Sequence, residues 1–324
     1  MILNIQCMQK VVIIGGPTGT GKTAVGIYLA KKFNGEIISA DSRQIYKYLE
    51  IGTNKGKVET FLNESNNEEY FIDGVKINLI NLIEPSEKFD LFRYQQLAYQ
   101  KINGLINLNK LPIMVGGTGL YIDSIVKNYS LEVNSESIHK ENSERRNFLN
   151  SLSKEQLQRL ILNKTGETHN LNYSDWNNPR RLIRFIEKFE ENLANKDENH
   201  NCQSNYDFLF LYPEYKWEEL KNKIDKRVIE MVNSGLIEET KNILKMGFTK
   251  EDPAFGIMGY KEILNYLDNE VSLDESITLI QQSHRQYAKR QRTWFENKNR
   301  DYNLEYFDSI KVAEGKVKKF LETK

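Results

Sequence analysis

A glycine-rich segment near the start of the chain has residue types and a spacing that suit anion binding. Residues 16–23 match the pattern G-x-x-x-x-G-K-[ST], between a β-branched run at 10–15 and a helical pattern at 23–33. Glycines let backbone N–H groups turn inward around an anion, and the start of a helix adds positive potential. Lys22 would supply a point charge, and the Thr23 hydroxyl a ligand for Mg²⁺. The segment predicts polyphosphate binding without specifying the polyphosphate. The predicted phosphate-binding residues are Gly16, Pro17, Thr18, Gly19, Thr20, Gly21, Lys22 and Thr23.

A carboxylate is missing where a nucleoside-triphosphate hydrolase would need one. Such enzymes hold Mg²⁺ with an acid at the end of a further apolar strand, but the apolar run at 111–115 is followed by Gly-Gly-Thr-Gly at 116–119. The acid that stands out is Asp41, at the end of another apolar run. Beside an anion it suits a general base or hydrogen-bond acceptor for an N–H nucleophile, while Ser42 and Gln44 could bond a flat heteroaromatic ring. The alternative is that Asp41 or Ser42 caps a following helix, and the spacing leaves both interpretations open.

Apolar runs that alternate with helical patterns predict the fold. Runs at 10–15, 36–41, 111–116 and 207–212 are typical of buried parallel strands, and Gly35 is the expected stop of the first helix. The alternation indicates an α/β fold, with a doubly wound, mainly parallel sheet of the P-loop type. Ligands of such sheets bind beyond the carboxyl ends of the strands, where the clusters 16–23, 41–44 and 116–119 all fall.

The middle of the chain predicts a second domain. Residues 143–191 are polar, charged and helical in period, and an Asn-rich stretch at 192–205 is typical of a loop. We therefore expect a helical insertion domain at 131–204. The catalytic core would then comprise residues 1–130 and 205–324, with a mostly helical C-terminal part from Trp217.

Composition narrows the class of protein. The 324 residues carry 45 basic and 45 acidic side chains, so a nucleic acid would have to bind a local basic face. Cys7 and Cys202 have no ligand spacing, which argues against a disulfide framework or a zinc site. No apolar run approaches the length of a membrane span, and residues 1–10 lack the pattern of a signal peptide. We expect a cytoplasmic protein that binds no membrane.

The glycine-rich loop at 16–23 and the segment that begins at Asp41 belong to an ordered set of motifs. This set resembles the tRNA dimethylallyltransferase (IPP transferase) family, and the resemblance spans residues 16–294. The further motifs are Asp41-Ser-Arg-Gln-Ile-Tyr46, Ile51-Gly-Thr-Asn-Lys55, Gly116-Gly-Thr-Gly-Leu-Tyr121, Asn177-Asn-Pro-Arg-Arg-Leu-Ile-Arg184, Phe255-Gly-Ile-Met-Gly-Tyr-Lys-Glu262 and Gln286-Tyr-Ala-Lys-Arg-Gln-Arg-Thr-Trp294. The chain departs from the family pattern at Glu50, usually Asp, at Gly56, usually Pro, and at 77–85, which lacks the usual His-His pair.

The resemblance implies a reaction. A dimethylallyl group would pass from dimethylallyl diphosphate to the N6 amine of adenosine 37, beside the tRNA anticodon, giving N6-(dimethylallyl)adenosine and diphosphate. Lys22, the loop amides and Mg²⁺ would stabilise the leaving diphosphate. Asp41 would orient the amine and accept its proton, and Thr118 would bond the adenine or the diphosphate, unless it merely caps the following helix. The base would have to leave its stack. The implied partners are the tRNA anticodon stem-loop and the prenyl donor, and the protein is expected to be a monomer.

The candidate tRNA contacts gather cations, aromatic residues and loop residues, which suits recognition of unstacked RNA. Either Arg145 or Arg146 could contact the RNA backbone, and Arg292 or Lys289 could instead reach the diphosphate. An ordinary solvated charged face, or for Gly259 a simple turn, is the competing account. The candidates are Asp41, Ser42, Arg43, Gln44, Thr118, Arg146, Arg180, Arg181, Leu182, Ile183, Arg184, Gly256, Ile257, Met258, Gly259, Tyr260, Lys261, Arg285, Lys289, Arg290 and Arg292.

Three rival functions belong to other classes. A P-loop kinase of small molecules would need a nucleoside pocket and an acidic Mg²⁺ ligand. An adenylate isopentenyltransferase has less need of the helical insertion and of the arginines at 180–184. An RNA-binding module with a vestigial P-loop has no need of Lys22, Thr23 and Asp41 together.

Overall fold

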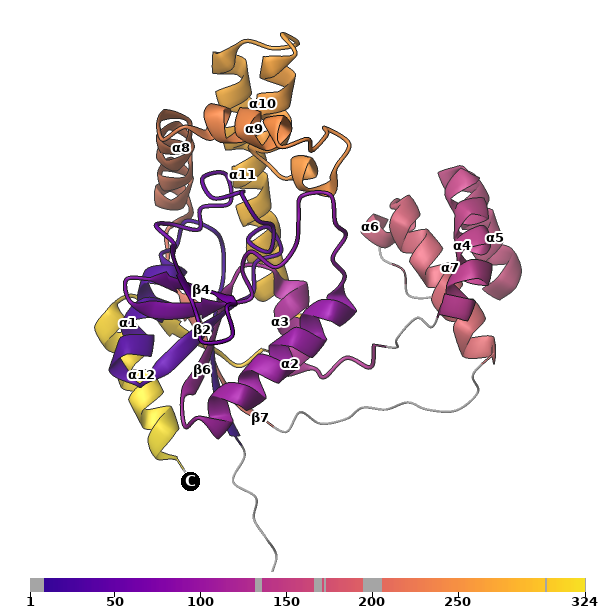
Figure 1. Cartoon of the computed structure of the whole chain (residues 1–324). Coiled ribbons are helices and arrows are strands. Elements are labelled where there is room, and N and C mark those ends of the chain that lie inside the picture. Colours follow the sequence, from indigo (N-terminus) through magenta and orange to yellow (C-terminus); the bar gives the residue numbers. More distant parts are fainter. Residues whose placement is uncertain are drawn as a thin grey trace, which may run out of the picture. The chain divides into compact units, whose positions relative to one another are not determined.

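The computed structural model describes residues 9–131, 136–165, 171, 173–194, 206–300 and 302–323. The chain divides into two compact units, the first made of residues 1–129 and 203–324 and the second of residues 130–202 (Figure 1). Cys7, Cys202 and the stretch 195–205, which includes most of the expected Asn-rich loop, lie outside the described residues.

A mixed sheet forms the centre of the first unit. In the described part of the chain it has eight strands in the order β3-β4-β5-β2-β6-β1-β7-β8. The strands from β5 to β8 in this order run parallel, whereas β3 and β4 add antiparallel pairs at one edge, so the mainly parallel α/β sheet is confirmed. The sequence patterns missed β3, β4, β5 and β8. The strands are β1 (Gln9–Gly15), β2 (Gly35–Ser39), β3 (Glu59–Leu62), β4 (Glu68–Ile72), β5 (Val75–Asn78), β6 (Leu111–Gly116), β7 (Tyr206–Pro213) and β8 (Leu304–Phe307).

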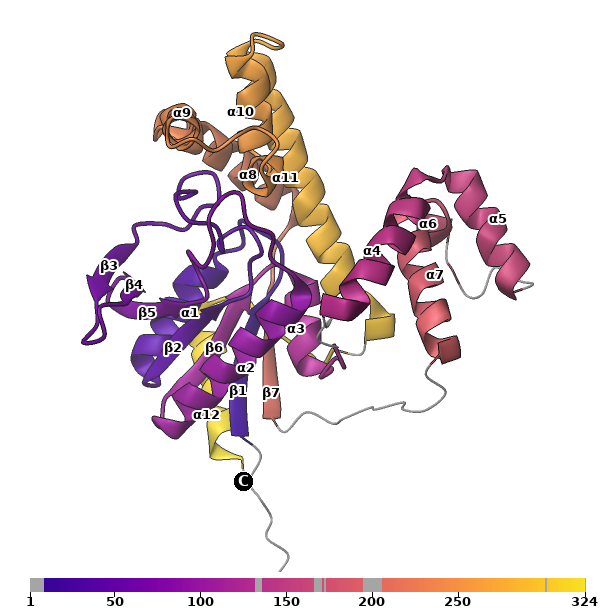
Figure 2. The same ribbon diagram turned by 45° about the vertical axis from the view of Figure 1, so that its right-hand side comes forward.

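Helices cover both faces of this sheet (Figure 2). Alternate residues of a strand point to opposite faces, so Val12 joins the core under α1 (Lys22–Lys32) and α12 (Ile310–Glu322). Val11 joins the opposite core under α2 (Leu91–Asn107) and α3 (Gly119–Val126). Because strands buried on both faces can present apolar residues at every position, the continuous apolar runs in the sequence correctly marked the central strands.

A group of helices packs over the loops at the carboxyl ends of the strands. It comprises α8 (Trp217–Asn233), α9 (Leu236–Lys245), the short η1 (Pro253–Gly256), α10 (Tyr260–Leu267) and α11 (Leu273–Phe295). Their apolar side chains form one cluster with Ile45 and Leu49, which lie in the segment after β2. The loops that carry the predicted chemistry are therefore enclosed between the sheet and these helices.

The expected stop at Gly35 is wrong by one residue. Helix α1 ends at Lys32, Asn34 takes the left-handed conformation with φ 49°, and Gly35 is already the first residue of β2. Asparagine tolerates this conformation better than most residues with a side chain.

The second unit is helical. It contains α4 (Glu136–Ser151), α5 (Lys154–Thr165), α6 (Tyr173–Trp176) and α7 (Pro179–Ala194), around a core that includes Leu149 and Ile161. Helix α7 starts with Pro179 directly after Asn178, whose side chain accepts a hydrogen bond from the backbone N–H of Arg181 at 3.3 Å. Asparagine before a first-turn proline is a favourable helix start.

Candidate active site

A cavity of about 360 Å³ lies at the carboxyl ends of β1, β2 and β6. Residues from all three predicted clusters line it, together with residues of α8 and α11. Of the eight predicted phosphate-binding residues, Gly16, Pro17 and Thr20 do not face the cavity. Its lining comprises Thr18, Gly19, Gly21, Lys22, Thr23, Ala24, Asp41, Arg43, Gln44, Thr53, Asn54, Val115, Gly116, Gly117, Lys223, Arg227, Glu230 and Gln291.

The loop between β1 and α1 presents the start of a helix to this cavity. Gly21 begins α1 with φ 83°, a conformation that residues with a side chain rarely adopt, and it supplies no side-chain cap. The first backbone N–H groups of a helix have no partner within the helix, so they are available to an anion. The Lys22 ammonium and the Thr20 hydroxyl both donate to the carbonyl of Pro17, at 2.6 and 2.9 Å, which closes the loop on itself.

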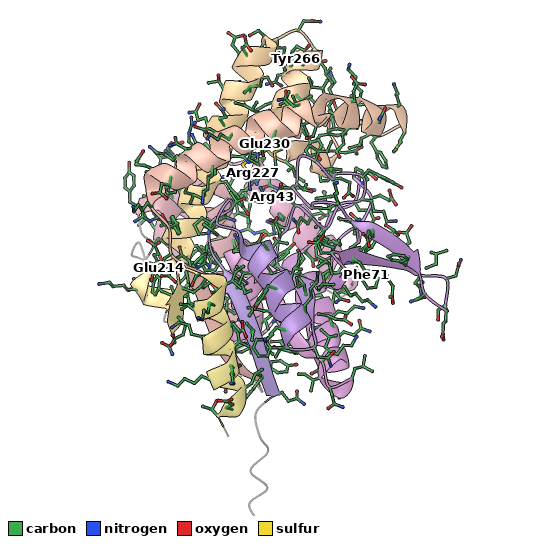
Figure 3. The ribbon with its side chains drawn as sticks, turned by 90° about the vertical axis from the view of Figure 1, so that its left-hand side faces the viewer. Arg43, Phe71, Glu214, Arg227, Glu230 and Tyr266 are labelled. Atoms are coloured by element: carbon green, nitrogen blue, oxygen red, sulfur yellow. The ribbon has the colours of Figure 1, made fainter. Side chains whose placement is uncertain are left out.

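Cations dominate the cavity wall. Burial lowers the pKa of Lys22 to about 7, against a partial opposing effect of Asp41. Arg227, from α8, is also buried: its pKa falls to about 10 through burial and through the charge of Arg43. Arg227 donates to the Thr18 hydroxyl at 3.0 Å, while its buried Nε has no hydrogen-bond partner among the described residues. Figure 3 shows Arg227, Glu230 and Arg43 between the sheet and the helices that cover it. A desolvated cation with an unused donor is what an anionic ligand would satisfy.

Asp41 lies in the cavity wall, paired with a neighbour. The Arg43 guanidinium donates to both carboxylate oxygens, at 3.0 and 2.8 Å, and the Arg43 backbone N–H donates to Oδ1 at 3.0 Å. Burial raises the pKa of Asp41, but the charge and hydrogen bonds of Arg43 outweigh it and the net pKa lies below its usual range. The guanidinium also stacks on Tyr287 at 4.4 Å from the ring centroid. Asp41 is therefore ionised at neutral pH and already holds one cation.

The alternative that Asp41 or Ser42 caps a helix is wrong. The residues directly after β2 form turns, and the described structure has no helix between β2 and α2, which begins at Leu91. The Asp41 side chain accepts from the backbone two residues on, as aspartate commonly does in turns. Gln44 instead joins neighbouring segments: its amide donates to the carbonyls of Thr53 and Asn54, both at 3.4 Å.

Thr118 does not itself line the cavity. Its hydroxyl accepts from the backbone N–H of Ser42 at 3.0 Å and donates to the Ser42 hydroxyl at 3.2 Å. Thr118 occupies the N-cap position of α3, but its side chain makes no capping hydrogen bond, so capping does not account for the hydroxyl. Thr118 thus ties the end of β6 to the segment that carries Asp41. Tyr121 and Ile122, in the first turn of α3, are buried packing residues.

Sequence reasoning missed several residues on α8 and α11. Besides Arg227, these are Lys223 and Glu230 on α8 and Gln291 on α11, all of which line the cavity. His284, on α11, is buried, and neither of its ring nitrogens has a hydrogen-bond partner among the described residues. Burial first, then the charges of Arg43 and Arg227, lower its pKa to about 3, so this imidazole is neutral.

Comparison with known proteins places these features in a family. The model of the IPP transferase family matches residues 44–298. The chain belongs to the IPP transferase family. It is 39% identical over 320 residues to a tRNA dimethylallyltransferase of Alkaliphilus oremlandii, covering 96% of this chain and 97% of that one. Its identity to a tRNA dimethylallyltransferase of Acetivibrio thermocellus is 37% over 324 residues, covering 98% of both.

Solved IPP transferases share the fold. A tRNA isopentenylpyrophosphate transferase of Bacillus halodurans matches with a TM-score of 0.66 and 32% identity, covering 97% of this chain and 95% of that one. A eukaryotic dimethylallyltransferase, described as acting on tRNA, matches with a TM-score of 0.73 and 26% identity, over 97% of this chain and 77% of that one. None of the described helices is both long and apolar enough to cross a membrane.

The departures from the family pattern have local physical consequences. Gly56 has φ 86°, which a proline ring cannot adopt, so the loop after Lys55 takes a path closed to the usual proline. The buried Lys55 ammonium donates to the Tyr46 carbonyl at 2.6 Å and pairs with the Glu50 carboxylate at 3.1 Å. Glu50, which is one methylene longer than the usual Asp, therefore forms an ion pair with Lys55. Asn78 stands in the segment without the His-His pair; it is buried and bonds the Ile37 carbonyl of β2 at 3.1 Å.

Several of the predicted contact residues lie away from the cavity. None of the residues 256–261 lines it, so the tRNA contacts predicted for them stay a prediction for a surface outside the cavity. Tyr260 is fully buried and accepts from the backbone of Gly52 at 3.1 Å, while Gly259 turns the chain into α10. Arg292 lies in a different cavity beside Trp217, where it bonds Glu296 at 2.9 Å, so it does not line the cavity that contains Lys22. Lys289 does not line the site either.

In the second unit, the motif at 177–184 separates into two faces. Leu182 and Ile183 are buried in the helical core, which rules out the RNA contact predicted for them. Arg180, Arg181 and Arg184 are exposed. Arg181 pairs with Asp175 and Arg184 lies 3.9 Å from Glu187. Arg145 pairs with Glu190 at 2.7 Å and Arg146 with Glu187 at 3.1 Å, so the structure does not choose between these two arginines.

Proposed function

We propose that this chain transfers the dimethylallyl group of dimethylallyl diphosphate to the N6 amine of adenosine 37, beside the tRNA anticodon. Transfer of a dimethylallyl group to tRNA is the activity that its family relatives are named for, and the chain shares it. The observation that carries the finer proposal is a single cavity that joins an anion site to an ionised carboxylate. The anion site is formed by the first backbone amides of α1, by Lys22 and by Arg227, whose Nε has no partner among the described residues. The carboxylate is that of Asp41.

The donor side of the cavity favours departure of diphosphate. As the bond from C1 of the dimethylallyl group to nitrogen forms, the bond from C1 to the diphosphate oxygen breaks and its electron pair stays on that oxygen. Negative charge therefore grows beside the first residues of α1 and the two cations Lys22 and Arg227, which line the same cavity. Anion binding raises the pKa of Lys22 again, because an adjacent negative charge favours the ammonium.

The acceptor side needs Asp41 as a hydrogen-bond acceptor and, late in the reaction, as a base. Adenine N6 is a weak base, but after bond formation the nitrogen carries positive charge and is strongly acidic. A carboxylate of low pKa can then take the proton. Because Arg43 occupies both carboxylate oxygens, we propose that the incoming adenine displaces at least one of its hydrogen bonds. The departing guanidinium keeps Tyr287 as a stacking partner.

The residues present fit Mg²⁺ that arrives with the donor. Among the described residues, no group of three or more His, Cys, Asp or Glu side chains could hold a metal alone. Mg²⁺ commonly binds through one or two protein ligands together with substrate phosphates and water, and the Thr23 hydroxyl in the cavity wall would be such a ligand. When bound, the ion would neutralise charge on the leaving diphosphate.

The RNA would be held by cations outside the cavity. On α11, Lys289 and Arg290 are exposed, whereas Arg285 is half-buried and pairs with Asp225 at 2.6 Å. In the second unit, Arg180, together with its neighbours at 181 and 184, offers exposed charge. Such contacts position an RNA backbone, while the flipped base is read in the cavity.

Nucleoside mass spectrometry tests the proposal. The protein is incubated with Mg²⁺, dimethylallyl diphosphate and either unmodified tRNA, an anticodon stem-loop or AMP, and the acceptor is then digested. We expect N6-(dimethylallyl)adenosine from tRNA and the stem-loop, and none from a stem-loop with guanosine at position 37. Faster modification of AMP would identify an adenylate isopentenyltransferase. Release of ADP from ATP with small alcohols, without use of the prenyl donor, would identify a kinase.

A further inference from the structure

One buried side chain of α11 bridges the two loops that carry the donor and acceptor sites. The Gln291 carbonyl oxygen accepts from the backbone N–H of Thr18 at 2.8 Å, and its NH₂ group donates to the Gly117 carbonyl at 3.0 Å. Gln291 is 4% exposed, so both hydrogen bonds are shielded from water. One carboxamide therefore joins the loop after β1 to the loop after β6.

The surrounding residues are shaped to admit this bridge. A Cβ atom at Gly117 would lie 1.9 Å from the Gln291 amide nitrogen, so position 117 must be glycine for the side chain to fit. Gln291 occupies the buried face of α11, in line with Ala288 and Phe295, where an apolar residue is the ordinary choice. A polar group at such a position costs free energy unless it is hydrogen-bonded, and here both ends of the amide are.

The Gln291 bridge lies beyond the last strand pairing between β1 and β6, where the sheet no longer connects the loops that follow these strands. The last registered pair between β1 and β6 is Gly15 with Gly116, and beyond it Gln291 connects Thr18, in the loop after β1, with Gly117, in the loop after β6. Gly117 precedes Thr118, whose hydroxyl bonds the backbone of Ser42 next to Asp41. Hydrogen bonds on either side of the covalently joined Gly117 and Thr118 thus link the loop after β1 to the segment that carries the carboxylate.

We propose that Gln291 is a positioning residue that sets the distance between the diphosphate site and the acceptor amine. This inference rests on the proposed function of the cavity. Displacement requires the two reacting atoms to be aligned at about 3–3.5 Å, and a misplacement of about 1 Å can cost about 100-fold in rate. Because Gln291 occupies the Thr18 N–H, that N–H is not an anion ligand. Loss of Gln291 should therefore slow transfer while diphosphate binding largely persists.

Two substitutions separate the bridge from simple packing. Gln291→Met keeps the length and most of the volume of the side chain but makes neither hydrogen bond. Gln291→Asn keeps the carboxamide but is one methylene too short to join both loops. Gln281→Met is the matched control, because Gln281 is on the same helix and donates to a backbone carbonyl, that of Asp225 at 3.2 Å, away from the cavity lining. Should Gln291→Met not fold, Gln291→Glu serves, because its ionised form can accept from Thr18 but cannot donate to Gly117.

The measurements are the single-turnover rate at saturating substrates, the affinity for inorganic pyrophosphate by calorimetry, the affinity for the stem-loop, and Tm. For both Gln291 variants we expect a rate loss of about 100-fold, with both affinities within about threefold of wild type. A rate within about threefold of wild type, a loss confined to pyrophosphate affinity, or an equal loss in Gln281→Met would overturn the proposal. Failure of the proposed function is distinguishable, because the wild-type protein itself would then form no N6-(dimethylallyl)adenosine in the stem-loop.

Discussion

Replacing Asp41 by Asn tests whether the carboxylate does chemistry or only holds Arg43. The pair is nearly buried, with side chains 13% and 11% exposed and a separation of 2.8 Å. At an effective dielectric constant near 20, the attraction at this distance is about 6 kcal/mol, much of which offsets desolvation. Breaking such a pair leaves the guanidinium unpaired and costs about 3–5 kcal/mol of folding stability. Loss of the proton acceptor costs a further factor of about 10²–10⁴ in kcat, with tRNA affinity retained.

The variant Arg43→Met separates the two effects. In the wild type, Arg43 holds the pKa of Asp41 below its usual range, so the carboxylate is ionised throughout the neutral range. Without Arg43, burial dominates and the pKa of Asp41 rises. Activity requires the ionised form, so the acid limb of the kcat profile should move to higher pH, and lost activity should return as the pH is raised. In Asp41→Asn, raising the pH should restore nothing.

The assay is single-turnover transfer to an anticodon stem-loop at saturating prenyl donor, with Tm measured in parallel. Asp268→Asn is the control, because Asp268 forms a partly exposed pair with Lys250 on the surface and should change neither quantity by much. The smallest loss of kcat expected for removal of a proton acceptor is about 100-fold. If Asp41→Asn keeps more than about a tenth of the wild-type kcat, the loss is far smaller than this, which refutes the reasoning.

Three further results follow from the same geometry. Since the pKa of Lys22 is about 7 in the free cavity and rises when an anion binds, the pyrophosphate affinity of the wild type relative to that of Lys22→Ala should be constant below pH 7 and fall above it; Lys22→Ala should bind more weakly and take up fewer protons, measured by calorimetry in buffers of different ionisation enthalpy, and a flat affinity ratio would contradict the assignment. Arg227→Ala should weaken pyrophosphate binding about 10- to 100-fold, the worth of a charge-assisted hydrogen bond, and unchanged calorimetric affinity would remove Arg227 from the donor site. Replacing Arg180, Arg181 and Arg184 together by Ala should weaken tRNA binding and reduce its salt slope by about 2–3 while leaving pyrophosphate affinity unchanged; an unaltered slope would show that these cations do not contact RNA.

The central strands and the glycine-rich turn at 16–21 before α1 were predictable because their signals are local. A strand buried on both faces is continuously apolar, and the glycine spacing of the loop is a backbone requirement. The position of Asp41 followed from topology, since the carboxyl ends of parallel strands meet at one edge of the sheet. By contrast, β3 and β4 are short strands at one side of the sheet; β3 is exposed and β4 is mostly half-buried, so they lack the buried apolar pattern of a central strand.

The residues that sequence reasoning missed come from helices that reach the site only in three dimensions. Their signal was nonetheless present: Arg227 follows the apolar stripe of α8 at helical spacing from Leu220 and Ile224, and Gln291 stands at a core position of α11. A polar residue at a core position breaks the expected pattern, and such breaks concentrate at functional sites. Leu182 was assigned to RNA because a motif was carried over as a block, although an apolar residue in an amphipathic helix belongs to its buried face.

The most direct test is a crystal structure of the protein with pyrophosphate, Mg²⁺ and an anticodon stem-loop. The account predicts pyrophosphate on the first backbone amides of α1, in contact with Lys22 and Arg227, and the N6 amine of a flipped adenine within hydrogen-bond distance of the Asp41 carboxylate. Pyrophosphate bound elsewhere, or an adenine amine held away from an Asp41 that keeps both of its Arg43 hydrogen bonds, would contradict it.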